Sequence, residues 1–111
     1  MDRQIIIDAL EEYIASAKDN EDKQRLRAAL TLYFKALVEG CDLLLYDRIL
    51  KVPSNHTERY EMLQRFFPEI YKITSPLFAI YRKSYSQVVT KEDVKKVKDG
   101  ANAVKEKAKA V

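Results

Sequence analysis

Apolar residues recur along this chain at the spacing of α-helices. Between residues 3 and 18 they fall on one side of a helix at about 100° per residue, which predicts a first amphipathic helix. The polar stretch KDNEDK that follows is short, so the second helix is expected to turn back antiparallel to the first. Three more helices are predicted: a short one at about 56–67, one that starts at Pro68, and one from about 91 towards the C-terminus.

The second predicted helix, at about 23–49, has apolar residues almost all the way round. A narrow polar strip on it is formed by Lys35, Glu39, Asp42 and Tyr46. A helix with this pattern has to be covered on several sides. We therefore expect it at the centre of the domain and, through one flank, in a homodimer interface made by Phe34, Val38, Leu45 and Ile49.

Capping residues and prolines refine these boundaries. Asn55 with Glu58, and Thr90 with Asp93, have the spacing of capping boxes and predict two helix starts. Pro76 lies inside an apolar run and is expected to kink or break the helix there. The predicted fold is all-α, an antiparallel up-and-down four-helix bundle with an additional short helix.

Length and composition set further limits. The 111 residues suit one domain, 1–111, with 47% hydrophobic and 33% charged residues, a charge content also typical of thermophiles. No apolar run is long enough to cross a membrane, and the acidic start lacks the pattern of a signal peptide. With Cys41 as the only cysteine, we expect a cytoplasmic protein without disulfides, metal site or cofactor.

Arg82 is the most informative polar residue of the fourth predicted helix. In LFAIYRKSY (77–85) it falls on the shoulder of the apolar stripe, beside Phe78 and Tyr85. An arginine in this position can lay its stem on aromatic rings and present its guanidinium to a phosphate or carboxylate. The alternative is a surface arginine that covers aromatic edges or pairs with an acid.

The order of several short stretches resembles the HEPN domain family over about residues 23–109. These stretches are YFKALVEGCDLLL, a polar loop, SNH, LFAIYRKSY and the helix start TKED. The resemblance implies a helical bundle, a homodimer, and a possible nucleotidyltransferase-like partner in a toxin–antitoxin type of pair. Many members of the family are metal-independent RNases.

The RNase motif of that family is incomplete in this chain. The motif is an arginine followed after about four to six residues by a histidine. After Arg82, the places of the histidine are filled by Gln87, Val88 and Val89. Arg82 and Tyr85 instead match the Arg-x-x-Tyr form of the branch without the motif, with Ser84 where aspartate is common. This departure favours binding of a nucleotide or RNA phosphate over cleavage.

His56 is the only histidine and has two interpretations. It lies on the helix face of Tyr60, Leu63 and Phe67, which is expected to pack inward, and the helix N-terminus disfavours its protonated form. These features favour a neutral packing or capping residue. The alternative is contact with the same ligand as Arg82.

The net charge of +3 comes from the last predicted helix. Residues 91–111 carry seven lysines against four acids, and five lysines form one stripe: Lys91, Lys95, Lys98, Lys105 and Lys109. Such a stripe could follow an RNA backbone. The alternative is a solvated flank drawn to the first 22 residues, which have seven acidic and two basic side chains.

Three functions remain open from the sequence. The leading prediction is a non-catalytic module that binds a nucleotide, an RNA phosphate or a protein partner through Arg82, Tyr85, Phe78 and His56. The second is a weak RNase that uses Arg82 with Tyr85 or His56 across a dimer cleft. The third is a structural adaptor.

Overall fold

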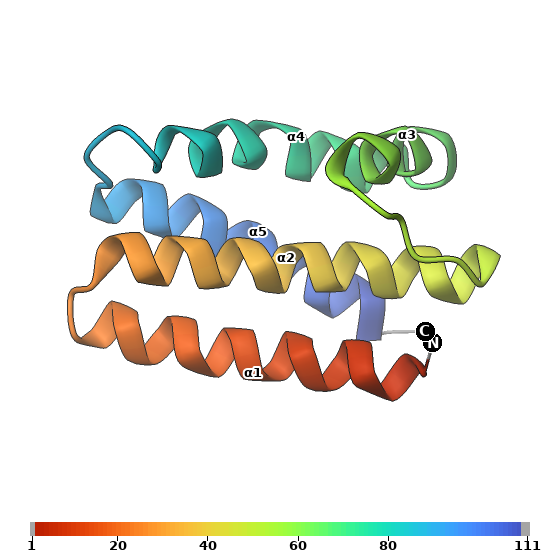
Figure 1. The fold of residues 1–111 in the computed structure, drawn as a ribbon, viewed down its shortest axis with the longest axis horizontal. Coiled ribbons are helices and arrows are strands. Elements are labelled where there is room, and N and C mark those ends of the chain that lie inside the picture. Colours follow the sequence, from red (N-terminus) through yellow and green to blue (C-terminus); the bar gives the residue numbers. More distant parts are fainter. Residues whose placement is uncertain (1, 110–111) are drawn as a thin grey trace.

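The structure, a computed structural model, describes residues 2–109, and its regular elements in that range are all helices (Figure 1). The five helices are α1 (Arg3–Asp22), α2 (Leu26–Ile49), α3 (His56–Phe66), α4 (Pro68–Lys83) and α5 (Lys91–Lys109). The all-helical prediction is confirmed. No helix in this range is both long and apolar enough to span a membrane.

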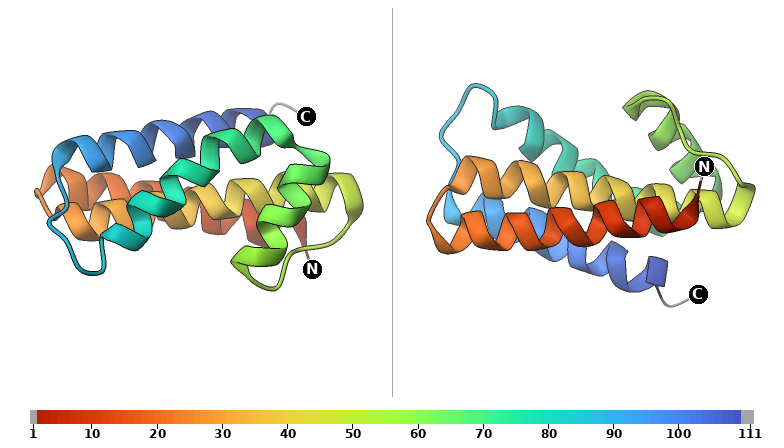
Figure 2. Two further views of the ribbon diagram at one scale, coloured as in Figure 1. Left: turned by 90° about the horizontal axis from the view of Figure 1, so that it is seen from above. Right: turned by 60° about the horizontal axis from the view of Figure 1, so that its bottom comes forward.

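Helix α2 lies at the centre of the fold. It packs against all four other helices, with α1 antiparallel beside it (Figure 1) and α4 crossing it obliquely (Figure 2). Burial explains the almost continuous apolar surface of α2, because its core residues Tyr33, Leu37 and Leu43 are each at most 1% exposed. A buried side chain of this size contributes roughly 1.5–3 kcal/mol, so α2 is the main source of hydrophobic stabilisation.

The predicted dimer flank of α2 is largely covered within the chain. Phe34 and Leu45 are 1% and 0% exposed, so they leave no surface for a second copy, and this part of the prediction is corrected. The physical reason is that α3, α4 and α5 together cover the sides of α2 that seemed to need a partner. Val38 and Ile49 are only partly buried.

The predicted helix starts are confirmed by their caps. The Glu58 N–H donates to Asn55 Oδ1 at 2.9 Å. Thr90 and Asp93 exchange two bonds, with the Thr90 N–H donating to the Asp93 carboxylate at 3.0 Å and the Asp93 N–H donating to the Thr90 hydroxyl oxygen at 3.1 Å. Each bond satisfies a backbone donor that the helix itself cannot pair.

Two predicted boundaries differ from the structure. Helix α1 continues through most of KDNEDK to Asp22, and α2 begins only at Leu26. The turn is short because Gln24 adopts a left-handed conformation with φ of 58°, which reverses the chain at once. A kink or a break was expected at Pro76, and the break does not occur: helix α4 runs from Pro68 through Pro76 to Lys83, with its apolar face packed on both sides of the proline.

Gly100 allows α4 to approach α5 closely. A Cβ atom at this position would overlap with Cδ1 of Leu77 and lie 3.6 Å from Cδ1 of Leu37. The absence of a side chain therefore lets α5 pack tightly against both α2 and α4. This close packing helps to fix the end of α4 that carries Arg82.

Candidate functional site

A small cleft opens on the side of α2 where α3 begins and α4 ends. It has a volume of about 120 Å³ and is lined by Tyr13, Phe34, Lys35, Val38, Glu39, His56 and Tyr81. These residues come from α1, α2, α3 and α4. The cleft therefore exists only in the folded chain.

Six rings form a continuous group beside this cleft, which we call the Phe78 cluster: Phe34, His56, Tyr60, Phe78, Tyr81 and Tyr85. The rings of Phe34 and Tyr81 stack with their centroids 4.2 Å apart and their planes 6° apart. The centroid of the His56 ring lies 5.1 Å from that of Phe78. Contacts of this kind add about 0.5–1.5 kcal/mol per pair, so the cluster is a firm support for the side chains around it.

Arg82 lies on this cluster at the position predicted from its helical phase. Its Cζ atom is 5.1 Å from the centroid of the Phe78 ring, a cation–π contact, and its side chain is exposed. No carboxylate within residues 2–109 forms an ion pair with it. Its hydrogen-bond donors are thus left for a ligand.

Tyr85 and Tyr81 form the opposite edge of the cluster. Tyr85 is 74% exposed, and its hydroxyl lies 2.6 Å from that of Tyr81. This hydrogen bond, followed by burial, raises the pKa of Tyr81 to about 12. One of the two hydroxyls donates to the other, so the pair has one O–H group left to donate to an anion.

His56 is held by a buried ion pair that the sequence did not reveal. The Arg59 guanidinium donates to both carboxylate oxygens of Asp42 at 2.7 and 3.0 Å, and the two residues are 8% and 5% exposed. A third N–H of Arg59 lies 2.9 Å from Nδ1 of His56. Because arginine only donates, Nδ1 is the acceptor and the proton of the neutral imidazole is on Nε2.

Burial and the nearby charges determine the protonation of these groups. Burial, together with the positive charge of Arg59, lowers the pKa of His56, so the ring is neutral near pH 7. Burial raises the pKa of Asp42, and the two hydrogen bonds from Arg59 act in the opposite direction. His56 is therefore the neutral packing residue that its helix position favoured, and it also lines the cleft.

Lys35 and Glu39 place opposite charges at the same cleft. Both come from the polar strip of α2, one turn apart, and Lys35 is exposed. Burial and the neighbouring Asp42 raise the pKa of Glu39, while Arg59 and Lys35 lower it. The cleft thus holds a lysine and, one turn away, a carboxyl group whose proton is retained more strongly than usual.

The lysine stripe of α5 mostly contacts acidic side chains. Lys98 pairs with Glu21 at 3.1 Å, and Lys105 and Lys109 both contact Glu11 of α1. Lys95 pairs with Asp99 at 2.7 Å on the same helix. Attraction to the acidic first helix, the alternative given above, thus accounts for three of the five lysines, and only Lys91 lacks an ion pair within residues 2–109.

A weak sequence signal for the buried pair was available. Asp42 interrupts a run of leucines on the most buried helix, where an unpaired carboxylate would be costly. Arg59 lies one turn after His56, on the inward face of its helix. The pairing itself depends on the angle between α2 and α3, and the spacing of apolar residues in the sequence does not predict this angle.

Metal or cysteine chemistry has no basis in the described residues. Residues 2–109 contain no group of three or more His, Cys, Asp and Glu side chains placed to hold a metal ion. Cys41 is 1% exposed, and burial raises the pKa of its thiol, which makes it a poor nucleophile.

Comparisons with family models, with curated proteins and with solved structures gave no match to this chain. The HEPN resemblance therefore stays a prediction, and the candidate site has to be judged by its own geometry.

Proposed function

We propose that the Phe78 cluster binds the phosphate group of a nucleotide or RNA, with Arg82 and His56 as the main donors. The observation that carries this proposal is the contact of both residues with the same ring, Phe78, while the Arg82 guanidinium and Nε2 of His56 have no hydrogen-bond partner within residues 2–109. Arg82 supplies the full charge and a planar set of donors. His56 supplies one neutral donor, Nε2–H.

Other side chains add to this environment. Lys35 lines the same cleft as His56 and brings a second, exposed positive charge. The buried hydroxyl of Tyr60 has no hydrogen-bond partner within residues 2–109, and its ring lies 5.2 Å from Phe78. The exposed ring of Tyr85 offers a face on which a base can stack.

The same geometry favours binding over hydrolysis. A general base needs a free lone pair, but Nδ1 of His56 already accepts a hydrogen bond from Arg59 and Nε2 carries the proton. The contact of Arg82 and His56 with one ring keeps a weak RNase as the second candidate, now with both residues from one chain. That activity would require His56 to leave Arg59.

The wider predictions are part of the same proposal. We place this site in a HEPN-like antiparallel up-and-down bundle, since α1 and α2 are antiparallel and α2 is central. A homodimer and a nucleotidyltransferase-like partner remain expectations from the family resemblance. If neither RNA nor nucleotide binds, the adaptor function becomes the better explanation.

The test is binding of a fluorescein-labelled single-stranded RNA, followed by anisotropy at several salt concentrations, with ATP as a competitor. Arg82→Ala should weaken binding about tenfold and reduce the salt slope by about 0.7 for the lost phosphate contact. Arg65→Ala is the matched control, because Arg65 is also exposed and its Cζ lies 5.2 Å from the ring of Phe66, outside the cluster.

Denaturing gels of the same mixtures separate the candidates. Intact RNA with binding that depends on Arg82 but not on Arg65 supports the proposal. Cleavage that is lost in both Arg82→Ala and His56→Gln would establish the RNase instead. Equal loss of binding in the Arg82 and Arg65 variants would mean general electrostatic attraction and would reject the site.

A further inference from the structure

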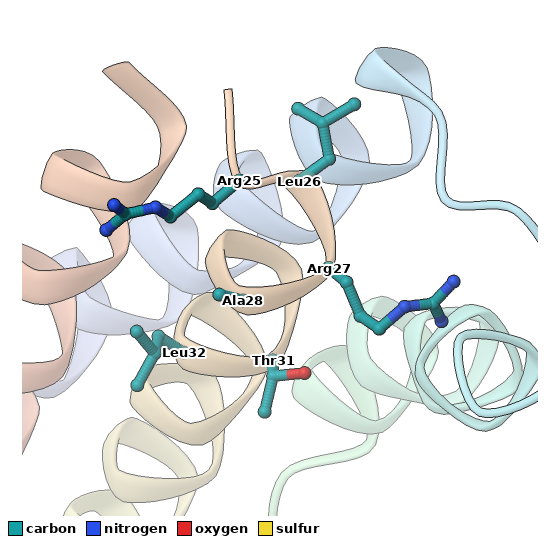
Figure 3. Close-up of a pocket in the computed structure, with 6 residues that line it drawn as sticks. All are labelled: Arg25, Leu26, Arg27, Ala28, Thr31 and Leu32. Carbon is teal, nitrogen blue, oxygen red and sulfur yellow. The ribbon is translucent and has the colours of Figure 1, made fainter. Parts of the chain in front are cut away.

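A second surface feature lies on the N-terminal half of α2, away from Arg82 and His56. It is an open trough of about 700 Å³, lined by Arg25, Leu26, Arg27, Ala28, Thr31 and Leu32 (Figure 3). The trough follows two turns of α2, and apart from the two arginines and one threonine its lining is apolar. We call it the α2 trough.

The two arginines flank the α2 trough. In Figure 3 the Arg25 side chain extends towards α1 and the Arg27 side chain extends to the opposite side, with Ala28 and Thr31 between them. Neither arginine forms an ion pair within residues 2–109. The trough is therefore apolar at its floor and positive at its edges.

The α4–α5 connection is held next to the trough on the Arg27 side. The Arg27 guanidinium donates to the carbonyl oxygen of Gln87 at 2.9 Å. The next residue of this connection, Val88, is 80% exposed.

We infer that the α2 trough binds an acidic amphipathic helix of a partner protein. Between Arg25 and Leu32, α2 rises by about 10 Å, which matches two turns of a second helix. The partner's apolar residues, three or four positions apart, would lie on Ala28 and Leu32. Its acidic residues on either side would face Arg25 and Arg27, so charge complementarity predicts that the partner helix is negatively charged along both flanks.

An apolar floor distinguishes this surface from the phosphate site. Ala28 and Leu32 offer no side-chain donors to a phosphodiester backbone. Covering them with the apolar side chains of a protein gains more binding free energy than placing a phosphate group over them. The inference does not rest on the proposed function, because Arg82 and His56 do not line the trough. Loss of one activity would leave the other intact.

The test is a selection from a display library of alanine-based helical peptides. The peptides carry Leu, Ile, Phe or Met at positions i, i+3, i+4 and i+7, and Glu or Lys at random on both flanks. The library is selected on the wild-type chain and depleted on the variant Ala28→Glu. Because Ala28 is exposed, this substitution places a carboxylate on the floor of the trough. We expect the retained peptides to carry Glu on both flanks.

Charge reversal then tests the assignment. In the double variant Arg25→Glu, Arg27→Glu, peptides with Glu flanks should bind about tenfold more weakly, and a new selection should return Lys flanks. The control is Lys72→Glu, Lys96→Glu, which changes the net charge equally at two exposed lysines outside the trough. Circular dichroism of every variant confirms that the helices are retained.

Three outcomes would overturn the inference. One is a library in which no peptide prefers the wild-type chain over Ala28→Glu. Another is the same flank preference before and after charge reversal. The third is single-stranded RNA that competes with the selected peptide and loses its own binding in the Arg25, Arg27 variant, which would assign the trough to nucleic acid.

Discussion

Replacement of Arg59 by methionine tests the most consequential polar interaction of this structure. The Asp42 and Arg59 side chains are 8% and 9% exposed, so Arg59→Met leaves a buried carboxylate without its cation. Loss of one partner of a buried pair costs about 3–5 kcal/mol, a large part of the roughly 5–15 kcal/mol by which domains are stable. We expect the free energy of unfolding, from urea denaturation followed by circular dichroism at pH 7, to fall by this amount.

Acid should partly rescue the variant. Burial raises the pKa of Asp42, and in the variant the hydrogen bonds and the charge of Arg59 no longer oppose that effect, so the folded variant binds a proton more strongly than the unfolded chain does. Its stability therefore falls as pH rises, and its deficit relative to the wild type should shrink as pH is lowered from about 7 to 5. The double variant Asp42→Leu, Arg59→Met, which removes both charges, should be close to the wild type.

The reasoning is refuted if Arg59→Met loses less than about 1 kcal/mol, which is the range of an exposed ion pair. It is also refuted if the deficit is independent of pH, or if the double variant is as unstable as the single one. Either of the first two results would mean that water reaches Asp42 in the folded chain, and the third would mean that the cost comes from the lost packing of Arg59 and not from the unpaired carboxylate.

Three further predictions use other features. Because the pKa of His56 is lowered in the folded chain, its contribution to stability is present above the ordinary pKa of about 6.5 and is lost as pH falls below that value. In His56→Gln, urea denaturation at several pH values should therefore show a smaller decrease of the free energy of unfolding towards acid pH than in the wild type. Gly100→Ala should lower the free energy of unfolding by about 1–2 kcal/mol, because overlap with Leu77 outweighs the gain in helix propensity; a raised melting temperature would contradict this. Leu50, 75% exposed with φ of 56°, should accept glycine with a gain of about 0.5–1 kcal/mol in thermal denaturation, whereas Leu50→Ala should give none.

Local properties of this chain could be predicted from the sequence. The five helices, the caps at Asn55 and Thr90 and the exposed position of Arg82 follow from periodicity and from side-chain bonds to residues three positions away. All of these depend on neighbours within one or two turns. Of the two effects expected at Pro76, a kink or a break, the break does not occur, because tertiary packing of α4 outweighs the one hydrogen bond that proline removes.

The candidate site was only partly predictable. Sequence singled out Arg82, Phe78, Tyr85 and His56, but not the order in which their rings meet. The Asp42–Arg59 pair joins residues 17 positions apart on different helices, and it decides which nitrogen of His56 carries the proton.

Tertiary structure also decided which apolar surface of α2 is left open. The sequence gives nearly every side of this helix similar polarity, so periodicity could not identify the face that the other helices leave uncovered. Packing of α3 to α5 buries Phe34 and Leu45 and leaves Ala28 and Leu32 beside two arginines. The physical reason is general: amphipathicity states how much surface a helix has to bury, while the crossing angles of its neighbours determine where.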